Sequence, residues 1–222
     1  MFALMSDDFV YQYSLTTPWD VTTASYASKS FDVAEDTDTD GIFIRSDGLK
    51  MFISGSTNNK IFQYTLSTAW DISTASFDTV ELDISLEETG VTDLFFKEDG
   101  TKMFIVGSQV DEVNEYALST PWVVSSGTAT SVFSVTAEDT GPEGIFFKDN
   151  GTRMFICGLQ NNKIYQYSVS TPWDITTASY DNISFDVSTE DIFTQGIFFK
   201  PDGTKIFMVG TEKDKVSEYN LD

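Results

Sequence analysis

Three of the four tryptophans in this 222-residue chain are followed directly by an aspartate, a pair suited to binding sugars. An indole ring stacks on the apolar face of a pyranose, and a neighbouring carboxylate accepts hydrogen bonds from its hydroxyl groups. Repetition of such a pair would create several equivalent weak sites and therefore avidity. The candidate ligand-binding residues are Trp19, Asp20, Trp70, Asp71, Trp122, Trp173 and Asp174. The same indoles could instead seal the edges of packed strands, so both roles stay open.

Acidic pairs recur at four places, namely Glu35-Asp36, Glu87-Glu88, Glu138-Asp139 and Glu190-Asp191. On one face of the protein they would form an acidic rim that attracts cations or a basic partner. The alternative is a set of solvated turns that favour solubility. Asp36, Asp38 and Asp40 also alternate before Gly41, as in the first half of an EF-hand calcium loop, although Asp47 stands where a bidentate Glu is expected. Calcium is therefore an alternative at Asp36, Asp38 and Asp40, and no other cofactor is expected.

Residues that commonly carry catalysis are scarce, because the chain has no histidine and a single cysteine. This composition excludes Ser-His and Cys-His catalytic arrangements and histidine-containing zinc or iron sites. Cys157 takes the place that Ser54, Val106 and Val209 hold in other copies of the repeat described below. We therefore interpret Cys157 as a small buried side chain rather than a nucleophile.

The formal charge of −22, from 13 basic and 35 acidic residues, opposes binding to a phosphate backbone or an anionic membrane surface. Nucleic acid is therefore not expected as a partner of this acidic protein. No apolar run approaches the roughly 18 residues of a transmembrane helix, and residues 1–10 lack the basic start and apolar stretch of a secretory signal. We expect no membrane insertion, and no signal peptide is visible in this chain.

All of these residues lie in a repeat, because the tryptophans are spaced by 51, 52 and 51 residues. The same spacing relates Tyr13, Tyr64, Tyr116, Tyr167 and Tyr219, and also Gly48, Gly100, Gly151 and Gly203. One copy, from Gly144, contains four short stretches rich in Phe, Tyr, Ile and Val, each predicted to be a strand. Asn-Gly or Asp-Gly between the first two stretches predicts a hairpin. Each copy is therefore predicted to be a four-stranded antiparallel meander.

The polarity of the four strands predicts how the copies assemble. The first two strands are almost continuously apolar, whereas the third and fourth admit polar positions, so burial should fall from first to last. Such a gradient, with a period near 50 residues, predicts an all-β fold, a β-propeller with its first strands innermost. We divide its single domain into a partial blade at 1–40, blades at 41–91, 92–142 and 143–194, and a partial blade at 195–222. We expect about five blades with incomplete terminal blades, and the alternatives are an open solenoid or one segment of a larger ring.

Two segments resemble known repeats. GIFFKPDGTKIFMVG, from Gly196, resembles the repeat of YVTN/lactonase-like β-propellers. The Ser-Thr-Pro-Trp-Asp-Ile-Ser/Thr-Thr-Ala-Ser-Tyr element is similar to tandem propeller repeats in surface proteins of marine bacteria and their phages. The resemblance spans essentially the whole chain and implies a scaffold that hosts many functions. Its wider group includes lactonases, which need a polar cluster at one mouth of the channel, and the regular repeats show no obvious unique cluster.

The leading functional prediction is a non-enzymatic binding or structural module displayed outside the cell or on a virion, such as a glycan-binding adhesin. Its partners would be glycans or other virion or cell-surface proteins, and it could form a homo-oligomer. The alternative is a carboxylate-dependent hydrolase or lyase of the lactonase-like type, acting at the channel mouth through Asp36, Asp40 or Glu143. A third option is an architectural role in which charged faces stack subunits.

Overall fold

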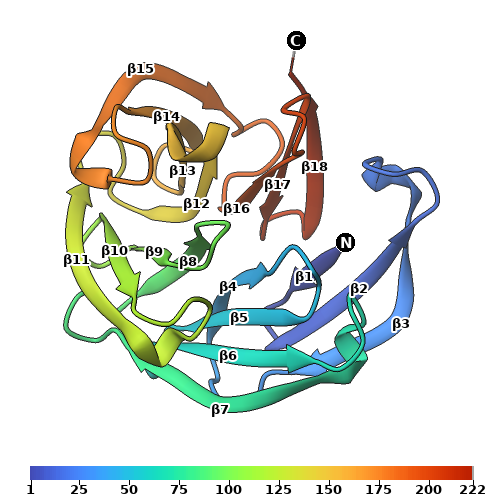
Figure 1. The fold of residues 1–222 in the computed structure, drawn as a ribbon. Coiled ribbons are helices and arrows are strands. Elements are labelled where there is room, and N and C mark those ends of the chain that lie inside the picture. The colour runs from blue at the N-terminus through green and yellow to red at the C-terminus, as the bar shows by residue number, and fades with distance from the viewer. Residues whose placement is uncertain (222) are drawn as a thin grey trace.

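The apolar stretches of each repeat form one antiparallel sheet, as predicted. Three four-stranded and two three-stranded sheets surround a central axis in the computed structural model, which describes residues 1–221 (Figure 1). Blade 1 contains β1 (Phe2–Leu4), β2 (Phe9–Leu15) and β3 (Ala24–Asp32). Blade 2 contains β4 (Thr39–Ile44), β5 (Lys50–Gly55), β6 (Lys60–Leu66) and β7 (Ala75–Asp83). Blade 3 contains β8 (Val91–Phe96), β9 (Lys102–Gly107), β10 (Glu112–Leu118) and β11 (Gly127–Ser134).

The remaining strands complete a five-bladed propeller. Blade 4 contains β12 (Pro142–Lys148), β13 (Arg153–Gly158), β14 (Lys163–Val169) and β15 (Ala178–Asp186). Blade 5 contains β16 (Thr194–Phe199), β17 (Lys205–Gly210) and β18 (Lys215–Asn220). The helical segments described are the three-residue turns η1 (Val21–Thr23), η2 (Ile72–Thr74), η3 (Val124–Ser126), η4 (Asp149–Gly151) and η5 (Ile175–Thr177). No helix in residues 1–221 is long and apolar enough to cross a bilayer.

The innermost strands approach one another closely where they bear a glycine. A β-carbon added to Gly41 of β4 would collide with the Cα of Asp93 in β8. Glycine at this position of blade 2 therefore lets the first strands of blades 2 and 3 pack closely beside the channel. The hairpin between the first two strands of blade 2 turns at Gly48, whose φ of 72° favours glycine.

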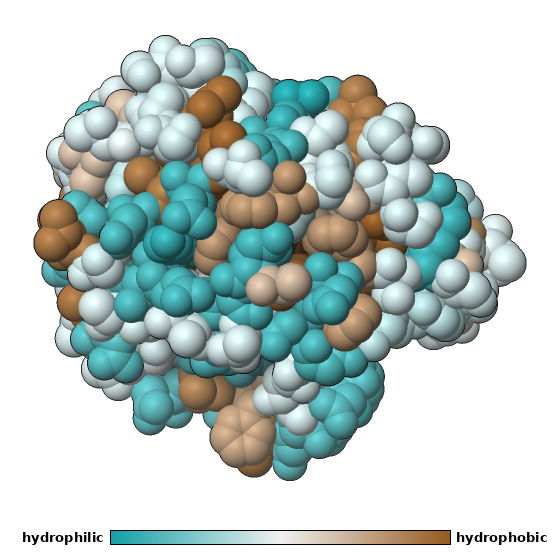
Figure 2. All heavy atoms as spheres, turned by 90° about the horizontal axis from the view of Figure 1, so that it is seen from below, coloured by the Kyte–Doolittle hydropathy of each residue, from teal (hydrophilic) through white to brown (hydrophobic). Residues whose placement is uncertain are grey.

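Phenylalanine side chains fill the interfaces between blades. Phe104 of blade 3 is fully buried and packs on Phe147 of blade 4, with 4.4 Å between ring centroids. Phe52 of blade 2 packs on Phe96 of blade 3 in the same way, at 4.3 Å. The apolar surface of each first and second strand is thus buried by the next blade, which explains their continuous apolar pattern. On the side of the protein seen from below, hydrophobic residues are scattered among hydrophilic ones (Figure 2).

Blades 5 and 1 share an aromatic contact and a lysine hydrogen bond with the internal blade junctions. The Trp19 ring of blade 1 lies 6.3 Å from Phe198 and 6.1 Å from Phe207 of blade 5. Lys205 Nζ donates to the Trp19 carbonyl at 2.9 Å, as Lys102 Nζ donates to the Trp173 carbonyl at 2.7 Å between blades 3 and 4. These repeated contacts close the five blades into a ring, so the predicted five-bladed fold with incomplete terminal blades is confirmed.

Candidate functional site

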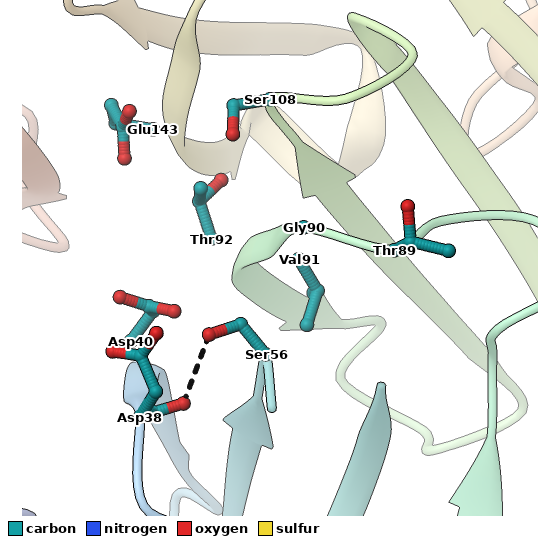
Figure 3. Close-up of a pocket in the computed structure, with 9 residues that line it drawn as sticks. All are labelled: Asp38, Asp40, Ser56, Thr89, Gly90, Val91, Thr92, Ser108 and Glu143. Atoms are coloured by element: carbon teal, nitrogen blue, oxygen red, sulfur yellow. Dashed lines mark hydrogen bonds between the residues drawn. The ribbon is translucent and has the colours of Figure 1, made fainter. Parts of the chain in front are cut away.

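A polar cavity of about 350 Å³ opens where the connections between blades meet the channel (Figure 3). It lies at the start of three innermost strands, which contribute Asp40 from β4, Thr92 from β8 and Glu143 from β12. Asp38, Ser56, Thr89, Gly90, Val91 and Ser108 complete the lining. The figure shows Asp38 and Asp40 on one side of the cavity and Glu143 near Ser108 on the other. The cavity therefore brings together acidic groups from blades 2 and 4.

The two acidic sides of this cavity titrate differently. Burial, followed by the charge of Asp38, raises the pKa of Asp40 to about 6. Burial, followed by the charges of Asp40 and Asp139, raises the pKa of Glu143 to about 8. Near neutral pH Glu143 therefore keeps its proton while Asp40 has largely lost its own. The cavity holds a proton donor and a proton acceptor at the same time, which is the requirement for paired acid and base catalysis.

A third carboxyl group follows the cavity residue Thr92 in the innermost strand of blade 3. Asp93 of β8 accepts hydrogen bonds from the backbone N–H groups of Leu94, at 2.8 Å, and Ile145, at 2.9 Å. These contacts tie the innermost strand of blade 3 to that of blade 4. Burial raises the pKa of Asp93 to about 7. Cys157 is fully buried, as predicted, and burial raises the pKa of its thiol.

Internal comparison of the repeats could have located this site. Asp40, Thr92, Glu143 and Gln195 occupy the same repeat position, just before the residue that contacts the next blade. The position bears a carboxyl group in blades 2 and 4, a hydroxyl in blade 3 and an amide in blade 5, whereas the surrounding strand is nearly constant. Features that recur predicted Glu143 only as one of three alternatives, and they gave no signal for Thr92 or Gln195, which do not recur.

The predicted acidic rim is wrong for the second residue of each pair, because these carboxylates are buried and bind backbone amides. Asp36, Glu88, Asp139 and Asp191 are only 4, 1, 2 and 1% exposed. Asp139, for example, accepts hydrogen bonds at 3.1 Å from the N–H groups of Gly141, Gln160 and Asn161. Glu35, Glu87, Glu138 and Glu190 instead accept from the hydroxyls of Tyr64, Tyr116, Tyr167 and Tyr219. Through these hydrogen bonds, each acidic pair holds the connection between two blades against an adjacent turn and strand.

The same orientation separates the three aspartates proposed for calcium. The Asp36 carboxylate accepts from the N–H groups of Thr37, Asp38 and Asn58, at 2.8, 3.1 and 3.0 Å. It therefore faces its own loop and the following turn, while Asp38 and Asp40 line the cavity. In residues 1–221 no group of three or more acidic or cysteine side chains is arranged to hold a metal ion. The structure does not bring Asp36, Asp38 and Asp40 together as a calcium site.

The tryptophans pack between blades, and the aspartates beside them cap turns. Trp122 lies 5.5 Å from the ring of Phe96 and 6.1 Å from that of Phe52. Trp19 and Trp70 remain 38% and 45% exposed. Asp20, Asp71 and Asp174 each accept a hydrogen bond from the backbone of the following three-residue turn. Each indole thus packs one face on a blade interface. The carboxylates of Asp20, Asp71 and Asp174 are already hydrogen-bonded within the turns beside them.

Replacing Asp139 by alanine should destabilise the protein by about 2 to 3 kcal/mol. The substitution leaves the N–H groups of Gly141, Gln160 and Asn161 without the carboxylate that accepts from them. Urea unfolding of the variant measures the loss. The exposed Glu212 is the matched control, and its replacement by alanine should change stability by less than about 0.5 kcal/mol. Equal stability of the two variants would contradict the role given to Asp139.

Raised carboxyl pKa values predict that the protein loses stability as the solution becomes alkaline. A carboxyl group with a higher pKa in the folded chain binds its proton more tightly there than in the unfolded chain. The free energy of unfolding should therefore fall as the pH rises from the pKa of each group in the unfolded chain to its pKa in the folded chain. The folded pKa is about 6 for Asp40, 7 for Asp93 and 8 for Glu143. Thermal unfolding at about pH 5 and about pH 9 measures this fall. Glu143→Gln should reduce it, and a higher unfolding temperature at alkaline pH would contradict the assignment.

Solved structures of known proteins share this fold at low sequence identity. A putative 6-phosphogluconolactonase from Bacteroides uniformis is 12% identical with a TM-score of 0.59, over 100% of this chain and 66% of that one. A second, from Bacteroides fragilis, is 11% identical with a TM-score of 0.59, over 97% of this chain and 61% of that one. A Lactobacillus plantarum protein is 15% identical with a TM-score of 0.59, over 97% and 62%. No protein-family model and no curated protein matches the chain.

These comparisons correct the prediction that the chain is not an enzyme. The same scaffold occurs in two proteins named as lactonases, so the fold does not exclude catalysis. At 11 to 15% identity the likeness concerns the fold alone, and this chain spans less than two thirds of the length of those structures. The predicted relation to surface proteins of marine bacteria and phages stays a prediction.

Proposed function

We propose that the channel-mouth cavity hydrolyses a small uncharged cyclic ester, with Asp40 as general base and Glu143 as general acid. The observation that carries the proposal is the pairing of a carboxyl whose pKa is about 6 with one whose pKa is about 8 in one cavity. At a pH between these values the first accepts a proton and the second donates one. The lactonase names of two structures with this fold favour an ester of this kind.

The reaction needs no group outside the cavity other than water. Asp40 removes a proton from a water molecule as its oxygen attacks the ester carbonyl carbon. The carbon–oxygen bond to the ring oxygen then breaks, and Glu143 transfers its proton to that leaving oxygen. Asp40 releases the proton it took, and Glu143 regains one, so the net reaction adds one water molecule across the ester bond. Thr92 and Ser108, on the cavity wall, supply hydroxyl groups for hydrogen bonds to the substrate.

The charge of the cavity selects against a phosphorylated substrate. Asp38, Asp40 and Glu143 are its acidic lining residues, and no lysine or arginine is among the residues that line it. A phosphate group would meet carboxylates with no cation to offset them, and the chain as a whole carries a charge of −22. We therefore propose an uncharged lactone rather than the phosphorylated substrate that the names of the two structures indicate.

A panel of uncharged five- and six-membered lactones, with a phosphorylated aldonolactone beside them, tests the proposal by measurement of acid release. We expect hydrolysis of at least one uncharged lactone, with no comparable rate for the phosphorylated one. The rate should rise as Asp40 loses its proton through about pH 6 and fall as Glu143 loses its proton through about pH 8. Rates no higher than the uncatalysed hydrolysis for every lactone would overturn the proposed function.

Glycan binding and display on a cell or virion surface stay predictions. The exposed parts of Trp19 and Trp70 are the feature that supports them. Asp71 is engaged by Ser73 N–H at 3.2 Å and Lys29 Nζ at 2.6 Å, so a sugar hydroxyl would compete with both contacts. A glycan array with the wild-type protein and a folded Trp70→Ala variant distinguishes this role, because a lectin would lose binding in the variant.

A further inference from the structure

The outer strand of blade 3 differs from the other outer strands in its charge. Among the described strands β11 pairs with β10 alone, and its other edge lies on the rim of the ring (Figure 1). β11 has no acidic or basic residue, and the uncharged stretch around it runs from Tyr116 to Ala137. The outer strands β3, β7 and β15 all carry charges, namely Lys29, Asp32, Asp78, Glu81, Asp83, Asp181 and Asp186. In a chain with a charge of −22, the edge of β11 is an exception.

Blade 3 keeps the ion pair of the repeat but places its carboxylate one strand further in. In blade 2 the Nζ of Lys50 pairs with Asp78 of the outer strand β7, at 2.6 Å. Lys102 holds the same repeat position in blade 3, and its Nζ pairs with Glu115 of β10, at 2.7 Å. Thr130 of β11 stands where β7 has Asp78. The lysine is thus neutralised without a charge on the outer strand.

The bulge in β11 is also smaller than the bulges in the other outer strands. In β3, β7 and β15 the ladder passes over two residues, and the second of them has a positive φ, namely Ser28, Thr79 and Asn182. In β11 the ladder passes over Thr130 alone, and no residue of this strand has a positive φ. Bulges twist an edge away from an incoming strand, and charges repel one. β11 therefore has the least protected edge of the four.

The exposed side chains of β11 suit pairing with another strand. Thr128, Thr130 and Val132 are exposed, and all three are β-branched, the shape that packs well in sheets. Val132 is 50% exposed, so its apolar surface remains in water in a single copy of the chain. An added strand would cover this side chain and bond to the outer backbone groups of β11.

A second copy of the same chain is the partner that this edge fits. Antiparallel pairing of two β11 strands about a two-fold axis places only uncharged side chains opposite one another. The same pairing through β7 would bring Glu81 and Asp83 of both copies together, and like charges on opposed strands are destabilising. Each copy carries a charge of −22, so self-association is least opposed at an uncharged edge.

We propose that two copies of this chain pair antiparallel through β11, so that the two third blades form one continuous sheet. A contact one strand wide buries less than the roughly 1,200 Å² of a standard interface, so the dimer is weak and reversible. No residue of β11 lines the channel-mouth cavity, so this pairing is independent of the proposed hydrolysis.

Sedimentation velocity of the 222-residue protein over a range of concentrations tests this pairing. We expect a monomer at low concentration and a dimer at high concentration, on the order of 1 mM. The dimer should be more abundant in about 0.5 M than in about 0.05 M NaCl, because salt screens the repulsion between two acidic chains. A monomer at every concentration would overturn the proposal. A dimer that dissociates as salt is added would also overturn it, because charged faces would then hold the copies together.

A matched pair of variants locates the contact. Val132→Glu gives β11 the residue that β7 has at the same repeat position, and it should weaken dimerisation at least about tenfold. Ser184→Glu makes the same change of charge at that position of β15 and should dimerise as the wild type does. Equal dimerisation of the two folded variants would contradict the location.

Hydrogen exchange of the wild type gives a second measurement that does not depend on a variant that folds. Backbone amides of β11 should exchange more slowly as the protein concentration rises, whereas those of β7 should not change. Exchange of β11 amides that is the same in monomer and dimer would overturn the assignment of the contact to this strand.

Discussion

Glu143→Gln should lower kcat/KM for lactone hydrolysis by about 100- to 10,000-fold, the usual contribution of one general acid. The amide fills nearly the same space as the carboxyl group that is 8% exposed in the cavity wall, but it cannot transfer a proton to the leaving oxygen. Steady-state kinetics at about pH 7 measures the effect. The descending limb of the pH profile near pH 8 should also disappear, because Glu143 causes it.

The control for this variant is Glu98→Gln, the same substitution at an exposed residue that is not part of the channel-mouth cavity. It should change kcat/KM by less than about twofold. Similar activity of the two variants would contradict the role of Glu143 as general acid.

Phe104→Ala should reduce the free energy of unfolding by about 3 to 5 kcal/mol. Phe104 is fully buried, and its ring lies 4.4 Å from Phe147 and 6.1 Å from Trp173 in the next blade. Removal of the ring leaves a cavity at an interface between two rigid sheets, which cannot close it without shifting a whole blade. Urea unfolding followed by circular dichroism measures the loss.

An exposed phenylalanine gives the comparison for that result. Phe193 is 47% exposed, and Phe193→Ala should cost less than about 1 kcal/mol because much of its ring is already in water. If the two variants were equally stable, the blade interface would not be the source of stability that the packing of Phe104 indicates.

Regular features of the fold could be predicted from sequence because they depend on neighbours along the chain. The Asn150-Gly151 turn and the apolar stretches beside it specify a hairpin locally, and a period near 51 residues then requires the copies to pack on one another. One of the two predicted roles of the tryptophans was to seal the edges of packed strands. Trp173 does so, because it packs on Phe95, Phe104 and Phe147.

The chemistry of the site could not be predicted in the same way because it depends on groups brought together across the channel. Asp40 and Glu143 lie in different blades, and only the curvature of the ring places them in one cavity. The prediction of a solvent-facing acidic rim was wrong for a related reason. Whether Asp139 faces solvent or backbone depends on the turn at Gln160 and Asn161, which follows about 20 residues later in blade 4.

The most direct test of the account is a titration of the side-chain carboxyl groups by carbon-13 NMR, with Glu143→Gln to assign the resonance of Glu143. We expect Glu143 to titrate near pH 8 and Asp40 near pH 6, so that one is protonated and the other ionised at neutral pH. Titration of both groups below about pH 5 would show that both are ionised at neutral pH, and would contradict an acid and a base poised together at the channel mouth.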